Sequence, residues 1–297
     1  MGAIIRGMTK DDTERVGEIL HDAFTGVATK YGYAPVMQSV QEGKSWAWAM
    51  FHYGSSEGIV AEEDGRVVGV VFLNKRGEHG GAGPMGIDPH FQGTTIAAKL
   101  MDALMEKGKC LSSLRAVQEA FNIRSFSLMY AYNFLPVTEV LDLYLNGNSK
   151  QPPDQRHSTI YELTAKDIDE ICEYDLPRSQ FDRRVDIAYF VRWGKVLVYR
   201  DQRGIRGFLA CLPSAGSVQL GPLLTEGEEE AGSLFRYAVA VFKGKTCRTR
   251  VMARDSTLAH SLLKMGFRLY CLNLLMIKGA WRPGKYIEAF GRFPEGV

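Results

Sequence analysis

The sequence lacks a hydrophobic run long enough to cross a membrane. Its most apolar stretches, residues 67–73 and 269–277, are far shorter than the roughly 20 residues that span a bilayer. Three consecutive apolar residues precede Arg6, too few for the core of a secretion signal. We therefore expect a cytoplasmic protein with no membrane partner.

A charge excess, cysteine pairs and metal-ligand motifs are also missing. The chain has 36 Lys and Arg residues against 34 Asp and Glu residues, and this net charge of +2 predicts no nucleic-acid partner. The five cysteines form no Cys-x-x-Cys pair, so without an export signal we expect reduced thiols. The absence of His-Glu-x-x-His and of clustered Cys and His residues predicts no metal site.

Two motifs occur in settings that exclude their usual chemistry. Residues 81–86 fit Gly-x-Gly-x-x-Gly, which binds dinucleotides only between a strand and a helix. Here a polar stretch, residues 75–80, precedes the motif and Pro89 follows it, so we expect a loop leading into a strand. Residues 54–58 fit the nucleophile elbow, but the expected order is helix then strand, the reverse of what that motif needs.

What the sequence does have is the composition of a globular protein. Of its 297 residues 45% are hydrophobic and 24% charged, enough for one large domain or two ordinary ones. The stretch from Asn146 to His157 has two prolines and no aliphatic or aromatic residue. We therefore predict a first domain at 1–146, a linker at 147–157 and a second domain at 158–297.

Helical and strand patterns alternate through the first half. We expect helices near 9–24, 35–53, 94–107 and 123–132, and strands near 3–6, 59–62, 67–73, 83–87, 114–118 and 137–145. Thr9 and Asp12 form a capping-box-like helix start, and Asp64-Gly65 is a hairpin turn signal. The class is therefore α/β (α+β).

The second half repeats several of these signals in the same order. Thr164–Asp167 mirrors the helix start at Thr9, and Gly221-Pro222 mirrors Gly83-Pro84. The offset of 138 residues between the two Gly-Pro pairs also separates Gly69 from Gly207. We interpret this as a duplicated fold; two unrelated α+β domains are the alternative.

The segment from Gly83 to Met101 has the pattern of an anion site. It is a strand, a short loop and a helix start, where the first backbone N–H groups lack partners and the helix dipole is positive. The small residues Gly93, Thr94, Thr95 and Ala97 let a phosphate approach these groups closely.

This loop resembles that of the GNAT superfamily of acetyl-CoA-dependent N-acetyltransferases. The family pattern is Q/R-x-x-G-x-G/A; Gln92 and Ala97 match it, whereas Thr95 stands where the family usually has glycine. A second family pattern is matched by Asn122, Ser125, Leu128 and Phe134. There Asn133 replaces a glycine, and Asn tolerates the left-handed conformation at a helix end.

The resemblance implies two tandem domains, each a mixed, mostly antiparallel sheet flanked by helices. It implies acetyl-CoA lying between the strands at 83–87 and 114–118, with no metal. The implied cofactor-binding residues are Met85, Gly86 and Ile87 along the pantetheine arm, Gln92, Gly93, Thr94, Thr95, Ile96 and Ala97 at the pyrophosphate, and Asn122 with Ser125 beside the arm. Residues 20–53, rich in aromatic side chains such as Tyr31 and Tyr33, would face the acceptor amine.

The proton-transfer residues are harder to place. The family's acidic tyrosine falls at Met129, which has no proton to give. The remaining candidates are His79, Glu119 and Tyr130, each with a structural role as the alternative. A well-aligned amine can also lose its proton to solvent, so the gap does not exclude an enzyme.

The second half resembles the degenerate C-terminal domain of some tandem GNAT proteins. Carboxylates at Glu226, Glu228, Glu229 and Glu230 stand where a pyrophosphate would bind and would repel it, so we expect no CoA site here. The aromatic residues Tyr286, Phe290 and Phe293 predict a tail that packs back on the protein.

The resemblance implies acetyl transfer from acetyl-CoA to a primary amine, with a small molecule as partner. Two alternatives stay open: a non-catalytic acyl-CoA-binding or regulatory protein, and a tRNA-dependent aminoacyl transferase, against which the near-neutral charge counts.

Overall fold

The computed structural model describes residues 2–149, 159–214, 216–280 and 284–291. These form two compact units. The first comprises residues 2–116, 121–135 and 277–280, and the second takes the other described residues. Residues 136–146, expected in the first domain, therefore group with the second unit. Most of the predicted linker, Trp281 and Phe293 lie outside the described residues.

The strands of the first unit follow the order β1 to β5. These are β1 (Ile4–Gly7), β2 (Ser56–Glu63), β3 (Arg66–Arg76), β4 (His79–Ile87) and β5 (Ser113–Glu119). The pairs from β1 to β4 are antiparallel and β4 with β5 is parallel, which confirms a mixed, mostly antiparallel sheet.

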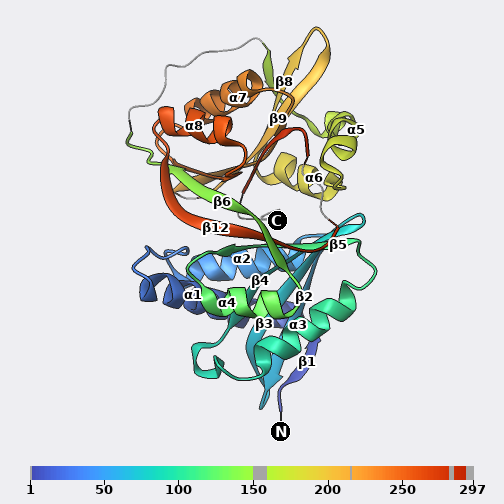
Figure 1. Ribbon diagram of the computed structural model, residues 1–297, viewed down its shortest axis with the longest axis vertical. Helices are drawn as coiled ribbons and strands as arrows, with labels where there is room; N and C mark the ends of the chain where they lie inside the picture. Colours follow the sequence, from blue (N-terminus) through green and yellow to red (C-terminus); the bar gives the residue numbers. More distant parts are fainter. Residues whose placement is uncertain (1, 150–158, 215, 281–283, 292–297) are drawn as a thin grey trace. The chain divides into compact units, whose positions relative to one another are not determined.

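Helices cover both faces of this sheet (Figure 1). They are α1 (Thr13–Lys30), α2 (Val40–His52), α3 (Ile96–Lys107) and α4 (Ile123–Ala131). A Cβ atom on Gly86 would touch Ile19 and Leu20 of α1, whereas one on Gly69 would touch Ile96 and Leu100 of α3. Because Gly86 and Gly69 face opposite ways on paired strands, α1 and α3 lie on opposite faces.

The second unit repeats this plan. Its strands lie in the order β12 (Arg268–Gly279), β6 (Leu135–Leu145), β11 (Thr246–Met252), β13 (Ile287–Phe290), β10 (Ser217–Thr225), β9 (Gly204–Pro213), β8 (Lys195–Asp201) and β7 (Ile160–Glu162). One buried cluster joins the sheet to α7 (Glu228–Val241) and α8 (Ser256–Lys264). The other joins it to α5 (Ile168–Ser179) and α6 (Arg184–Trp193), and Tyr286 packs against it as expected of the tail.

The duplication is visible in the register of the strands. His79–Gly81 of β4 pair with Ser113–Arg115 of β5, and Ser217–Gln219 of β10 pair with Thr246–Arg248 of β11 in the same parallel sense. Both β4 and β10 carry a register shift at their Gly-Pro pair. The shared irregularity supports a duplicated fold over two unrelated domains.

Several element boundaries differ from the expected ones, among them the end of the first helix and the start of β4. The helix expected to end near Phe24 continues to Lys30, and β4 begins at His79, four residues ahead of the strand expected at 83–87. The glycines of β4 form a strand because ladder hydrogen bonds need only backbone groups. A Cβ atom on Gly80 would touch the side chains of Leu111 and Leu114. Side chains of neighbouring residues therefore pack over the glycines of β4.

Within the described ranges, no helix is both long and apolar enough to cross a membrane. The same residues contain no group of three His, Cys, Asp or Glu side chains arranged to hold a metal ion.

The N-terminus of α1 is fixed by an ion pair. The Asp12 carboxylate accepts hydrogen bonds from Arg6, at 2.7 Å, and from the Thr9 backbone and hydroxyl, which confirms the capping box. Arg6 first, and then the Thr9 groups, lower the pKa of Asp12 to about 2 against desolvation that raises it. Since this value lies below that of the unfolded chain, Asp12 contributes stability above about pH 4 that is lost as the pH falls through about 2.

We predict that Asp12→Asn lowers the free energy of unfolding by about 1–2 kcal/mol at pH 6 and by much less near pH 2. Urea denaturation at both pH values measures this. Asp11→Asn is the matched control, because Asp11 is exposed beside it. An effect of Asp12→Asn that is equally large at both pH values contradicts the assignment.

Candidate functional site

The strands β4 and β5 pair over only part of their length. Pairing ends at Gly81 with Arg115, and β4 then continues to Ile87. In the part of the chain that the structure describes, no strand pairs with this edge of β4 beyond Gly81. We call the opening beside residues 82–87 the first wedge; along it, the backbone groups on this edge of β4 have no strand partner among the described residues.

A bulge at Gly83 shapes the deep part of the first wedge. Gly83 has φ of 125°, a conformation that favours glycine, and its carbonyl accepts a hydrogen bond of 2.9 Å from the Asn74 amide. A Cβ atom built on Gly83 would meet only the Met85 nitrogen, at 3.8 Å. The space beside Gly83 is therefore open.

A loop anchored at Asp88 follows β4. The buried Asp88 carboxylate pairs with Arg15 and accepts a hydrogen bond of 3.0 Å from the His90 backbone. Thr94 Oγ1 donates to the Phe91 carbonyl at 2.7 Å. These bonds fix the loop between the end of β4 and the start of α3, and the predicted segment 92–97 begins in this loop.

The start of α3 presents free hydrogen-bond donors. Among the described residues, the backbone N–H groups of Gly93, Thr94, Thr95 and Ala97 donate no hydrogen bond. Gly93 has φ of 83°, and a Cβ atom there would meet nothing within 4 Å. Exposed donors at a positive helix end, with open space beside Gly93, form a site suited to phosphate.

Asn122 and Ser125, which the sequence predicts beside the cofactor arm, lie at the start of helix α4. Asn122 Oδ1 accepts from the Ser125 backbone at 3.2 Å and so caps the helix, which leaves the Asn122 amide nitrogen for another partner. At the other end of α4, the Tyr132 hydroxyl lies 2.9 Å from the Ala98 carbonyl and 2.7 Å from Asp102 Oδ1 of α3. Burial and then Asp102 raise the pKa of Tyr132 to about 12, so this hydroxyl keeps its proton.

The three predicted proton-transfer residues lie in separate places. His79 stands where β4 and β5 are still paired, with Nδ1 2.8 Å from Ser113 Oγ, and burial lowers its pKa so that the ring is neutral at pH 7. Glu119 is the last residue of β5, and Tyr130 is exposed on α4 with its ring stacked on Phe126. No hydrogen bond joins any two of the three within the described ranges.

An aromatic cluster near α4 contains a residue that the sequence did not single out. Phe121 stacks on Tyr33 with ring centroids 4.3 Å apart and meets Tyr31 at 5.4 Å. Tyr31 and Tyr33 follow the C-terminus of α1, and Phe121 precedes Asn122. Nothing in the local sequence could have predicted this contact, because its partners are about 90 positions apart.

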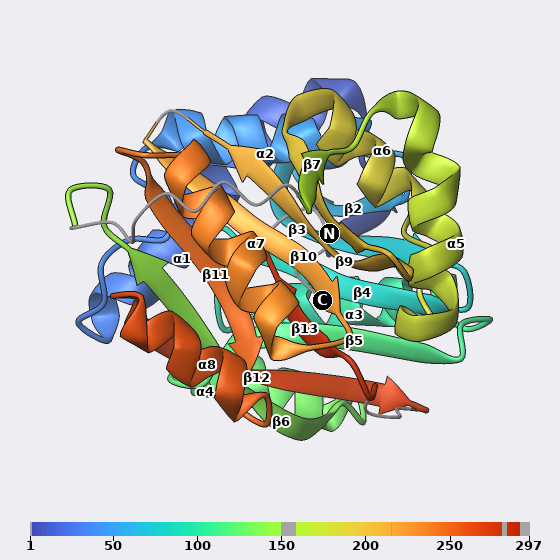
Figure 2. The ribbon, with the colours of Figure 1, turned by 90° about the horizontal axis from the view of Figure 1, so that it is seen from above.

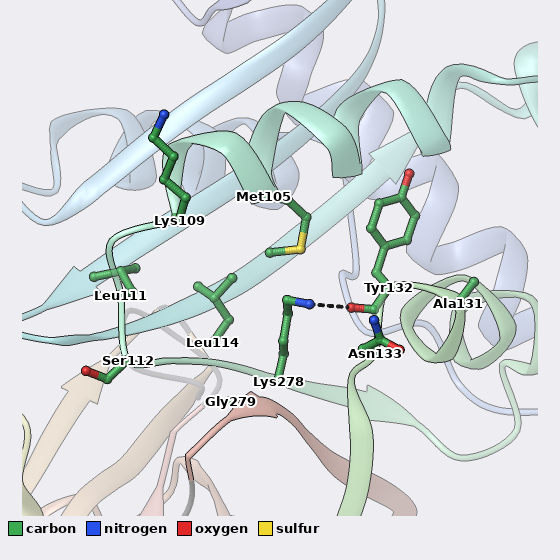
Figure 3. A pocket seen from close by; sticks show the side chains of 11 residues that line it. Met105, Lys109, Leu111, Ser112, Leu114, Ala131, Tyr132, Asn133, Lys278 and Gly279 are labelled. Carbon is green, nitrogen blue, oxygen red and sulfur yellow. Dashed lines mark hydrogen bonds between the residues drawn. The ribbon is translucent and has the colours of Figure 1, made fainter.

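A cavity of about 370 Å³ lies at the C-terminal ends of α3 and α4 (Figure 3). Met105, Leu111 and Leu114 give it an apolar wall. Lys278 donates to the Tyr132 carbonyl at 3.2 Å and so caps α4. The free N–H donors are at the opposite end of α3, so this cavity is not part of the first wedge.

The second unit has a corresponding divergence of β10 from β11. Pairing of these two strands ends at Gln219 with Arg248, and β13 lies between them further along (Figure 2). We call this region the second wedge. It differs from the first in that a strand of the same chain fills it.

Comparison with known proteins identifies both halves. Residues 15–132 match the model of the acetyltransferase (GNAT) family, and residues 173–290 match that of an acetyltransferase (GNAT) domain. A search of curated proteins found no match.

Solved structures share the fold at low identity. A proposed acetyltransferase from Pyrococcus horikoshii is 17% identical with a TM-score of 0.78, covering 98% of this chain and 94% of that one. A GCN5-related N-acetyltransferase from Sphaerobacter thermophilus is 15% identical with a TM-score of 0.64, covering 95% and 96%. A tandem GNAT protein from the clavulanic acid biosynthesis pathway is 13% identical, with a TM-score of 0.64 and coverage of 95% and 99%.

Proposed function

Because the chain belongs to the GNAT acetyltransferase family, we propose that it transfers an acetyl group from acetyl-CoA to a primary amine of a small molecule. The first wedge carries this proposal, because an unpaired strand edge leads directly to a helix start with free N–H groups. The amides of a pantetheine arm can pair with a strand edge as a peptide does, and a pyrophosphate suits the helix start.

In this proposal each part of the cofactor has its own group of residues. The backbone of Met85 and Ile87, with Gly86 between them, pairs with the pantetheine arm. The segment Gln92, Gly93, Thr94, Thr95, Ile96 and Ala97 holds the pyrophosphate, and Asn122 with Ser125 borders the arm. The open space over Gly83 and Gly93 supports this placement, because neither position has a side chain in the way of the ligand.

The proposed reaction forms an amide and breaks a thioester. The amine nitrogen attacks the thioester carbonyl carbon, the C–S bond breaks, the amine loses a proton and the CoA thiolate gains one. Of the predicted proton-transfer residues, His79 has a neutral ring that can accept a proton. The hydroxyl of Tyr132, which was not among them, is engaged by Asp102. Alignment of the amine with the thioester, with solvent taking the proton, also suffices for transfer.

Incubation with acetyl-CoA and a panel of primary amines tests the proposal, with release of the CoA thiol and the product mass as readouts. We expect acetylation of at least one amine. CoA binding without product from any amine would instead support a non-catalytic acyl-CoA-binding protein. Transfer that needs charged tRNA would support the aminoacyl transferase.

A carboxylate at position 93 should weaken CoA binding. We predict that Gly93→Asp raises the Kd for CoA roughly tenfold or more, because the charge faces the pyrophosphate. Gly93→Asn is the matched control, since Asn has nearly the same shape and also tolerates this backbone conformation without the charge. Isothermal titration calorimetry measures both, with Glu228→Lys in the second unit expected to change nothing. Equal Kd values for the Asp and Asn variants would refute the pyrophosphate site.

Met129 should be dispensable for proton transfer. It is 7% exposed on α4, so Met129→Leu keeps its volume and we expect kcat within about twofold of the parent. Steady-state rates with an accepted amine measure this, and circular dichroism checks the fold. A hundredfold lower kcat in a folded variant would show that Met129 takes part in the chemistry.

A further inference from the structure

The occupant of the second wedge pairs with the same backbone positions that the first wedge leaves free. In β13, Ala289, Glu288 and Ile287 pair antiparallel with Leu223, Leu224 and Thr225 of β10. These three β10 residues lie 138 positions after Met85, Gly86 and Ile87, the offset of the sequence repeat. On its other side, β13 pairs with Arg250 and Val251 of β11. The strand therefore takes the place that the proposed function gives to the pantetheine arm in the first unit.

The space around the glycine at each bulge also shows that the second wedge is filled and the first is open. A Cβ atom on Gly221 would collide with the backbone of Phe290 and Gly291, whereas one on Gly83 would meet only the Met85 nitrogen, at 3.8 Å. Gly221 thus allows close approach of the tail backbone. At the equivalent point of the first wedge the space is open.

The connection between β10 and α7 also differs from the corresponding connection between β4 and α3 in the first unit. Only Glu226 and Gly227 separate β10 from α7, whereas residues 88–95 separate β4 from α3. The loop that offers free donors in the first unit is therefore missing. Glu230 folds back over Gly227, where a Cβ atom would collide with its carboxylate, and Glu226 pairs with Arg178 at 3.0 Å and with Arg206.

We infer that residues 287–290 act as a built-in ligand of the second wedge, closing it to acyl-CoA. The identification of the second wedge as a former cofactor groove rests on the proposed function of the first. The tail supplies the backbone partners that β10 and β11 need, and the carboxylates of Glu226 and Glu230 stand where a phosphate would bind. Ala289 is 1% exposed in this strand, and its side chain belongs to the buried cluster that joins the sheet to α7 and α8.

Hydrogen exchange on the unmodified protein, with and without CoA, tests the inference. We expect the amides of 221, 223–225 and 287–290 to be protected without CoA and unchanged when it is added, because their partners are within the chain. The free amides of residues 93–95 and 97 should exchange fast without CoA and at least about tenfold more slowly with it. Rapid exchange of 221–225 in the free protein, or new protection there on adding CoA, would overturn the inference.

A buried charge in β13 should release the tail. We expect Ala289→Asp to raise the exchange rate of 221–225 at least about tenfold, since an unpaired carboxylate is costly inside a sheet. Lys285→Asp is the matched control: it places the same residue at an exposed position just before β13 and should leave exchange unchanged. If Ala289→Asp does not fold, the exchange pattern of the unmodified protein still decides.

The same data separate the two proposals. Protection of 92–97 without any change at 221–225 supports both. No protection of 92–97 by CoA, with 221–225 already protected, would refute the cofactor site while leaving the self-filled wedge intact. Protection of both regions by CoA would refute only the inference about the tail.

Discussion

A parallel strand pair that separates part-way along its length exposes backbone groups that need partners, and much of this fold follows from how each unit meets that need. Buried N–H and C=O groups left unpaired cost free energy, so an opening in a sheet must be filled by protein, ligand or water. The second unit fills its opening with β13. The first leaves residues 82–87 of β4 without a strand partner among the described residues.

The loop after the diverging strand determines whether the next helix N-terminus is open to an anion or is already occupied by carboxylates of the chain. Between β4 and α3, residues 88–95 are anchored by Asp88 and Arg15 and present free N–H groups next to Gly93. Between β10 and α7 two residues suffice, and the helix begins with Glu228, Glu229 and Glu230. Carboxylates favour a helix N-terminus as a bound anion would. The second unit thus satisfies its helix dipole with its own side chains.

The sequence predicted the parts of the fold that depend on local pattern. The capping box at Thr9, the hairpin at Asp64-Gly65 and the 138-residue repeat all rest on residue type and spacing, and the structure confirms them. The start of β4 was missed, because its glycines have no side-chain periodicity and the strand is specified by its neighbours.

The candidate site was only partly within reach of the sequence. The segment from Gln92 to Ala97 and the cap at Asn122 follow from short motifs. The stack of Phe121 on Tyr33 and the pairing of β13 with β10 join positions far apart in the chain, which no local pattern encodes. The tail aromatics indicated that the C-terminal segment packs back, yet they could not show that it enters the sheet.

The proposed function gives the chain one acetyl-CoA site, in the first wedge. The most direct measurement is native mass spectrometry of the full chain titrated with acetyl-CoA. We expect saturation at one cofactor per chain. Saturation at two, or no binding at all, would contradict it.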